Sequence, residues 1–140
     1  MTTPTSKPPE TVLVVDDDPE VLSLAVDILG AAGYTVLSTT DPRQALRLAR
    51  THPEPVHLLV TDVVMPLMNG MQLATEVQVL RPDVKILLIS AYRTKETEDF
   101  RMRLGLRGLF LDKPFTVAAL TGAVRSLLTA RASSPWRRPQ

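Results

Sequence analysis

Residues 11–20, TVLVVDDDPE, place three consecutive aspartates directly after a run of apolar residues. The apolar run is typical of a strand that is covered on both faces. Adjacent carboxylates repel each other and are costly to bury, so three of them at a strand end require an explanation. Asp18 precedes Pro19, a pair typical of a helix N-cap followed by the first helical residue. We therefore expect Asp18 to cap a helix, which leaves Asp16 and Asp17 for another role.

The rest of the chain alternates short apolar runs with longer segments of helical spacing. Gly33 and Gly105 stand where two of these helices should end, and Asp41 before Pro42 repeats the capping pattern. Five strand–helix pairs predict an α/β fold with a parallel sheet, right-handed crossovers and helices on both faces. The predicted strands are 11–15, 34–38, 56–61, 84–89 and 107–111, and the predicted helices are 19–32, 42–51, 70–80, 94–104 and 116–129.

Length, charge and composition limit the classes of protein to which this chain can belong. The 140 residues suit one domain, which we place at residues 11–130, with disordered tails at 1–10 and 131–140. The sequence has no cysteine, which excludes disulfides and thiolate chemistry. Acidic residues slightly outnumber basic ones in 11–130, which does not favour nucleic-acid binding. No apolar run approaches the roughly 20 residues that span a bilayer, so we expect a cytoplasmic protein without a membrane partner.

Chemically active side chains stand at the ends of four predicted strands. They are Asp16 and Asp17, Asp62, Ser90, and Asp112 followed by Lys113. Since the carboxyl ends of parallel strands share one edge of a sheet, we expect these side chains, except a solvent-facing Asp112, to meet in one pocket. Clustered carboxylates cannot all stay ionised without a cation, and oxygen ligands without His or Cys favour Mg²⁺ over Zn²⁺. A lysine supplies a positive charge for a phosphoryl oxygen, and a carboxylate can itself accept a phosphoryl group.

Four motifs occur in order along residues 11–130: VVDDDPE, LVTDVVMPLMNG, LLISAY and LFLDKPF. Together they resemble the motifs of the response-regulator receiver domains of two-component signalling. The resemblance implies a flavodoxin-like (βα)5 doubly wound sandwich, with a five-stranded parallel sheet in the order 2-1-3-4-5. Periodicity alone predicts only a parallel α/β sheet.

The resemblance also implies roles for the pocket residues, with Mg²⁺ as the cofactor. Asp62 matches the phosphoacceptor, which is also a metal ligand. Asp17 matches the direct metal ligand, and Asp16 matches the second acid, which holds the metal through water. The backbone carbonyl of Val64 matches a further ligand. Lys113 matches the lysine that pairs first with the aspartate and then with the phosphoryl group.

Further positions match the switch and the control of phosphate lifetime in this family. Ser90 matches the hydroxyl that turns toward the phosphoryl group, and Phe110 matches the aromatic side chain that then turns inward. The Lys113–Pro114 bond matches a peptide bond that is usually cis. Val64 and Tyr92 match the positions that flank the hydrolytic water. Since neither side chain positions water well, we expect slow loss of the phosphoryl group.

The implied function is that of a phosphorylatable receiver, which is not a turnover enzyme. A sensor histidine kinase or a histidine phosphotransfer protein would supply the phosphoryl group from a phosphohistidine to Asp62. The face formed by 94–104, 107–111 and 116–129 would then change shape for an unknown downstream protein, or the group would pass along a phosphorelay. We expect either a free-standing chain, which the first methionine and the polar tail favour, or a piece of a larger hybrid protein. In both cases we expect a monomer or a weak phosphorylation-dependent dimer, with no nucleic-acid partner.

The sequence leaves other functions to consider. A pseudo-receiver would bind a protein without being phosphorylated, although the functional positions of the family are all retained here. A DNA-binding regulator would need an effector domain, which we do not expect in 131–140. A phosphate hydrolase acting through Asp62 would need a second acid where Val64 stands. The segment GLFLDKPFTVAAL, residues 108–120, also resembles receivers at the C-terminal ends of hybrid histidine kinases.

Overall fold

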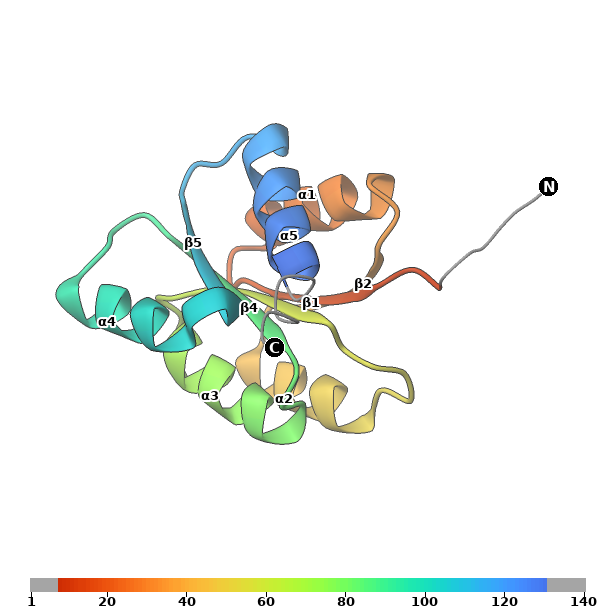
Figure 1. Ribbon diagram of the computed structural model, residues 1–140, viewed down its shortest axis with the longest axis horizontal. Coiled ribbons are helices and arrows are strands. Elements are labelled where there is room, and N and C mark those ends of the chain that lie inside the picture. The colour runs from red at the N-terminus through yellow and green to blue at the C-terminus, as the bar shows by residue number, and fades with distance from the viewer. Residues whose placement is uncertain (1–7, 131–140) are drawn as a thin grey trace, which may run out of the picture.

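The computed structural model describes residues 8–130, so the predicted tails lie outside the described residues except for 8–10. In the described range, five parallel strands form one sheet in the order β2-β1-β3-β4-β5 (Figure 1). The strands are β1 (Thr11–Val15), β2 (Thr35–Thr39), β3 (Leu58–Asp62), β4 (Lys85–Ser90) and β5 (Gly108–Asp112). The predicted fold and strand order are confirmed. The last four strands each end one residue later than predicted, on Thr39, Asp62, Ser90 and Asp112.

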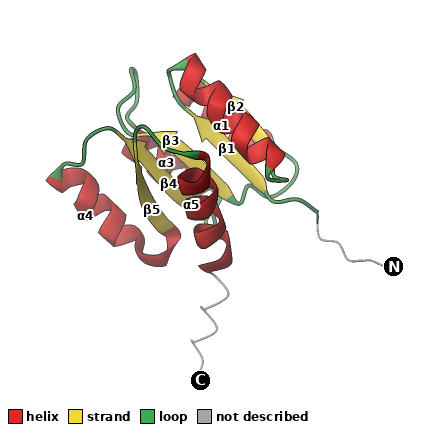
Figure 2. Cartoon of the chain, turned by 90° about the horizontal axis from the view of Figure 1, so that it is seen from above, coloured by secondary structure: helices red, strands yellow, loops and turns green. Residues whose placement is uncertain are grey.

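Helices cover the two faces of the sheet in separate layers, which Figure 1 shows from the side and Figure 2 from above. On one face lie α1 (Pro19–Ala31) and α5 (Val117–Ala130). On the other face lie α2 (Pro42–Thr51), α3 (Gly70–Leu80) and α4 (Lys95–Leu104), and α4 continues into a 3₁₀ turn at Gly105–Arg107. The layers create two hydrophobic cores with the sheet between them.

Strand β1 is apolar from Val12 to Val15 because these four residues contribute to both cores. Val12 and Val14 pack in the core beneath α1 and α5, whereas Leu13 and Val15 pack in the core of the other three helices. Successive side chains of a strand point to opposite faces, so a strand between two helical layers has no polar side. Full burial of one such side chain stabilises the fold by about 1.5–3 kcal/mol. This double burial fixes the register of β1, and hence the point at which Asp16 emerges.

The predicted helix boundaries are confirmed where polar or glycine signals marked them. The Asp18 side chain accepts a hydrogen bond of 2.9 Å from the N–H two residues later, and Asp41 makes the equivalent contact at 2.8 Å. Each bond satisfies one backbone donor that a helix start leaves without a partner. Gly33, after α1, has φ of 100°, and Gly105, after α4, has φ of 59°. Both values lie in the left-handed region that glycine tolerates best.

The start of α3 is fixed against the backbone of Asp62, a feature that the sequence analysis missed. The Asn69 side chain accepts from the Gln72 N–H at 2.9 Å, while the Gln72 side chain accepts from the Asn69 N–H at 3.1 Å. This reciprocal capping box closes the first turn of the helix. Gly70, the first residue of α3, lies so close that a Cβ there would overlap the carbonyl oxygen of Asp62. The helix start therefore supports the strand end that carries Asp62.

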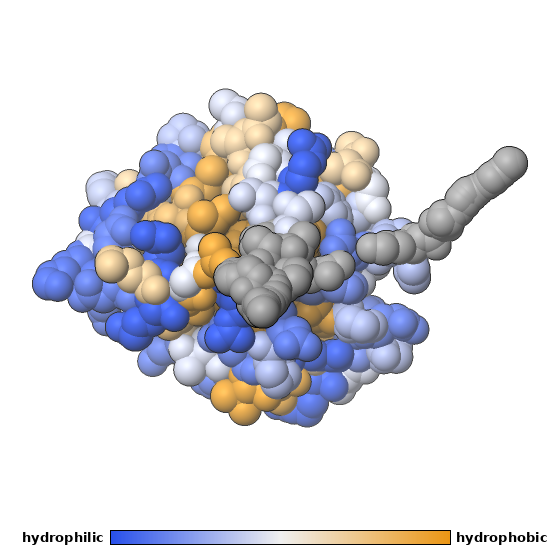
Figure 3. All heavy atoms as spheres, viewed as in Figure 1, coloured by the Kyte–Doolittle hydropathy of each residue, from blue (hydrophilic) through white to orange (hydrophobic). Residues whose placement is uncertain are grey.

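The surface of α4 is strongly polar, in contrast to the two cores. The space-filling view shows hydrophilic residues over most of this helix at the left of the molecule (Figure 3). Its buried residues are limited to Thr97, Phe100 and Leu104.

No helix in residues 8–130 has both the length and the apolar character needed to cross a membrane.

Replacement of Gly70 by alanine tests the close approach of α3 to Asp62. We predict that Gly70→Ala lowers the free energy of unfolding by about 1–3 kcal/mol, because the added methyl group meets backbone that cannot move aside freely. Gly122→Ala is the matched control, since nothing lies within 4 Å of a Cβ at that helical position. The control should gain about 0.5–1 kcal/mol from better helix propensity. Urea unfolding measures both, and equal stability of the two variants would contradict the close approach.

Candidate functional site

The carboxyl ends of β1 and β3 bring three carboxylates together. Asp16 and Asp17 directly follow β1, and Asp62 is the last residue of β3. One carboxylate oxygen from each of them lies within 4.8 Å of the other two. Asp16 and Asp62 are buried, whereas Asp17 is exposed. Oxygen ligands that are closed on one side and open to water on the other suit Mg²⁺, which keeps part of its water shell in proteins.

Lys113 links the two buried carboxylates. Its Nζ lies 3.1 Å from Oδ2 of Asp16 and 3.1 Å from Oδ2 of Asp62. The lysine directly follows β5, and its backbone N–H donates to the carbonyl oxygen of Ser90 at 3.0 Å. The Lys113–Pro114 peptide bond is cis, as the resemblance implies. The structure thus joins the ends of β1, β3, β4 and β5 through one residue.

The pKa values of Asp16 and Lys113 are shifted by burial and by the charges of their neighbours in the pocket. Burial raises the pKa of Asp16, and the charge of Asp62 raises it further. The Asp18 N–H, which donates to Asp16 at 2.9 Å, and the Lys113 ammonium act in the opposite direction without cancelling the effect of burial. Burial lowers the pKa of Lys113, but its contacts with Asp16 and Asp62 outweigh that effect and leave the pKa raised. The lysine is therefore held in its charged form, whereas burial disfavours the ionised form of Asp16.

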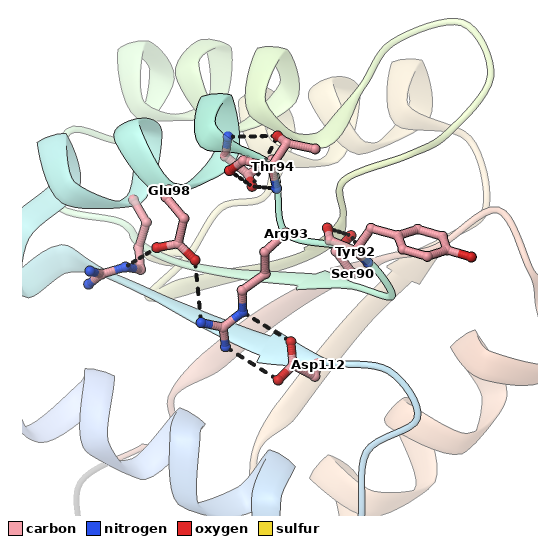
Figure 4. Close-up of polar contacts among 8 residues, drawn as sticks. Ser90, Tyr92, Arg93, Thr94, Glu98 and Asp112 are labelled. Atoms are coloured by element: carbon pink, nitrogen blue, oxygen red, sulfur yellow. Dashed lines mark hydrogen bonds and ion pairs between the residues drawn. The ribbon is translucent and has the colours of Figure 1, made fainter.

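Ser90 is buried at the end of β4, and its hydroxyl bonds within its own loop. Its Oγ donates to the carbonyl oxygen of Tyr92 at 2.7 Å and accepts from the Tyr92 N–H at 3.1 Å. The Tyr92 side chain is 78% exposed, and its ring points away from the neighbouring Arg93 (Figure 4). Val64, on the loop after β3, is 70% exposed and donates its N–H to Oδ1 of Asp62 at 3.3 Å. Both residues that were predicted to flank the hydrolytic water thus have solvent-exposed side chains.

Phe110 and Asp112, on β5, share a partner that the sequence did not reveal. Phe110 is partly buried, and the guanidinium carbon of Arg93 lies 4.7 Å from its ring centroid. Asp112 faces solvent, as predicted, but it also forms an ion pair of 3.0 Å with Arg93. No sequence signal pairs Arg93 with Asp112, because the two residues come from different strand ends and only the sheet order brings them together.

The strand order and the polar strand ends have a counterpart in a known protein family. Residues 12–125 match the family model of the response regulator receiver domain. The chain belongs to this receiver domain family. Receiver domains are a part of two-component signalling, and the acidic cluster of this chain lies within the matched residues.

Several relatives of this receiver domain share about a third of its residues. The transcriptional regulatory protein PrrA of Mycobacterium tuberculosis is 33% identical over 123 residues, which are 88% of this chain and 52% of PrrA. The sensor kinase CckA of Brucella abortus is 32% identical over 118 residues, which are 84% of this chain and 12% of CckA. The chain spans about half the length of PrrA and a small part of CckA, so each match concerns one region of the relative.

Solved structures resemble the receiver domain over nearly their whole length. A CheY-like response regulator receiver domain protein from Methanospirillum hungatei superimposes with a TM-score of 0.79 and 25% identity, covering 89% of this chain and 97% of that chain. The receiver domain of the hybrid histidine kinase CckA gives a TM-score of 0.71 and 30% identity, covering 84% and 98%. The likeness includes a receiver from a hybrid kinase, the class that residues 108–120 resemble.

Neutralisation of Asp16 tests the electrostatics of the pocket in the absence of a metal. Because its pKa is raised on folding, the folded protein binds this proton more tightly than the unfolded chain does. The contribution of this group to stability is therefore complete at low pH and is lost as the pH rises through the folded-state pKa. In chelator-treated protein we predict that Asp16→Asn is more stable than the wild type at pH 7. The difference should vanish below about pH 3, where aspartate is protonated in both states. Urea unfolding across this range measures it, and a wild type that is the more stable at pH 7 would contradict the prediction.

Proposed function

We propose that this receiver domain, residues 11–130, accepts a phosphoryl group on Asp62. The supporting observation is the cluster of three carboxylates whose two buried members contact Lys113. In the proposed step, an Asp62 carboxylate oxygen attacks phosphorus, the bond from phosphorus to the donor nitrogen breaks, and its electron pair stays on that nitrogen. Such a transfer needs positioning and neutralisation of charge more than any other chemistry from the protein.

The residues of the pocket would share the neutralisation of charge. We assign Mg²⁺ to Asp16, Asp17 and Asp62, with the backbone carbonyl of Val64 as a further ligand. The ion, when bound, would offset the negative charge that gathers on the phosphoryl oxygens. Lys113 already contacts Asp62 and keeps its charge, so its ammonium is available to a phosphoryl oxygen once the group has been transferred.

Ser90 and Phe110 would carry the signal from the pocket to the surface. The Ser90 hydroxyl would leave Tyr92 and donate to a phosphoryl oxygen, which is a stronger acceptor than a carbonyl group. Phe110 would then turn inward and alter the face formed by α4, β5 and α5. This is a two-state switch that a local change of charge biases.

We infer that the phosphoryl donor is a sensor histidine kinase or a histidine phosphotransfer protein. The likeness to a region of a sensor kinase and to a region of a transcriptional regulatory protein supports this role. The receiver would pass its signal to a downstream protein, as a monomer or a weak phosphorylation-dependent dimer, or pass its phosphoryl group along a phosphorelay. It would act in the cytoplasm without contacting nucleic acid or a membrane, and it would not be a turnover enzyme.

Intact mass after incubation with Mg²⁺ and a small phosphodonor, or with a donor kinase, tests the proposal. We predict a gain of one phosphoryl group in the wild type and none in Asp62→Asn, which lacks the accepting carboxylate. Asp17→Ala should also fail, because it removes a metal ligand. Asp18→Asn is the matched control, since asparagine caps a helix as well as aspartate does and this carboxylate serves α1. A wild type that gains no mass with either donor would instead indicate a pseudo-receiver that only binds a protein.

Tyr92 gives a prediction about the lifetime of the phosphorylated form. The hypothesis that its bulk hinders the hydrolytic water predicts that Tyr92→Ala loses the phosphoryl group faster by roughly two- to tenfold, a change of up to about 1.4 kcal/mol in the barrier. Tyr92→Phe keeps the ring and should retain the wild-type rate. The decay of the phosphorylated mass with time measures both rates, and an unchanged half-life in Tyr92→Ala would count against the hypothesis.

A further inference from the structure

The loop between β4 and α4, residues 91–94, contains an arginine that is paired on two sides. Arg93 donates from Nε and Nη2 to the two carboxylate oxygens of Asp112, at 3.0 Å and 3.4 Å. Its Nη1 lies 3.4 Å from Oε2 of Glu98 on α4. Figure 4 shows the guanidinium between these two carboxylates. A planar guanidinium that meets a carboxylate through two N–H groups is held in orientation as well as in distance.

The same guanidinium covers the ring of Phe110. Its central carbon lies 4.7 Å from the ring centroid, within the range of a cation–π contact. Arg93 therefore contacts β5 through Phe110 and Asp112, and α4 through Glu98. We call this set of four residues the Arg93 latch. It ties the loop after β4 to two of the elements that form the proposed output face.

The latch belongs to the loop that holds the Ser90 hydroxyl. Ser90 Oγ bonds to both backbone groups of Tyr92, and Tyr92 directly precedes Arg93. A hydroxyl that is to turn toward Asp62 must give up these bonds, and the backbone at Tyr92 must then find other partners. Because the next residue is fixed to Asp112, Glu98 and Phe110, the loop cannot rearrange freely while the latch is closed.

We propose that Arg93 is a positioning residue that holds the β4–α4 loop in its unphosphorylated arrangement, and thereby sets how readily the phosphorylated arrangement forms. The inference rests on the proposed function, in which Ser90 moves toward the phosphoryl group. Phe110 turns inward only when it leaves the guanidinium, so the latch opposes both movements of the switch. Opening of the latch releases Asp112 and Glu98 to solvent or to a partner protein.

The strength of the latch is modest and depends on salt. The side chains of Arg93, Asp112 and Glu98 are 43%, 66% and 36% exposed, so water screens the ion pairs. The two-pronged contact with Asp112 and the contact with the Phe110 ring add to the small stabilisation that one exposed ion pair provides. Together they support a shift of roughly two- to tenfold in the equilibrium between the unphosphorylated and phosphorylated arrangements of the loop. Exposed ion pairs weaken as ionic strength rises, so high salt should act as removal of the arginine does.

Binding of beryllofluoride, a phosphoryl mimic, in the presence of Mg²⁺ tests the latch. A ligand that binds only the switched arrangement binds more tightly when that arrangement is more populated. We expect Arg93→Ala to lower the Kd by roughly two- to tenfold, and Arg93→Lys to give an intermediate value because it keeps the charge but not the two-pronged contact. The ratio of wild-type to Arg93→Ala Kd should fall toward one between about 0.05 M and about 1 M NaCl.

Arg101→Ala is the matched control for charge. Arg101 also pairs with Glu98, at 3.7 Å, but it lies on α4, and no ion pair or ring contact joins it to Asp112 or Phe110 among residues 8–130. It should leave the Kd near the wild-type value, although it removes the same positive charge. An equal shift in Arg93→Ala and Arg101→Ala would overturn the proposal, and so would a wild-type Kd in Arg93→Ala.

Hydrogen exchange of the metal-free protein separates failure of the latch from failure of the proposed function. The latch predicts faster exchange of the loop amides at 91–94 in Arg93→Ala than in the wild type or Arg101→Ala. If the wild type fails to bind beryllofluoride, the proposed function is wrong, but this measurement still decides whether Arg93 holds the loop. Unchanged exchange in Arg93→Ala would overturn the latch even in a protein that is phosphorylated normally.

Discussion

The contact of one lysine with two buried carboxylates is the interaction on which the site depends. Asp16 and Asp62 leave two adjacent strands of the sheet at the same edge, and without a positive charge their proximity would oppose the fold. Lys113, from the end of β5, supplies that charge. A divalent cation shared with Asp17 would supply further positive charge. Binding of the ion that the proposed chemistry needs would therefore also stabilise the folded state.

The backbone around the pocket makes this arrangement rigid on one side and adjustable on the other. At β1 and β3, register is fixed by two cores, and α3 begins directly against Asp62. At β4 the chain leaves the sheet into a loop in which the Ser90 hydroxyl bonds locally to Tyr92, and the exposed Arg93 latch joins this loop to β5 and α4. A fixed Asp62 beside a loop that can move would suit the proposed switch. Phosphoryl transfer requires a precisely placed carboxylate, whereas the signal requires a change in the position of the loop.

The sequence predicted the features that depend on short segments. Continuous apolar runs located the strands, Asp18 and Asp41 located helix starts, and polar strand ends identified Asp16, Asp17, Asp62 and Lys113 as neighbours. The strand order required the family resemblance, since periodicity does not say which parallel strands are adjacent. The capping box at Asn69 was recognisable from the glutamine three residues later, but it was missed. The Arg93 contacts were beyond prediction, because they join side chains from elements that only the folded sheet brings together.

We propose that the ends of β1 and β3 form a divalent-cation site beside Lys113. An NMR titration with Mg²⁺ at constant ionic strength tests it most directly. We expect a saturable change confined to the amide signals near Asp16, Asp17, Asp62 and Val64, and the loss of this change in Asp17→Ala. Small changes that do not saturate and that spread over the acidic surface would contradict the claim.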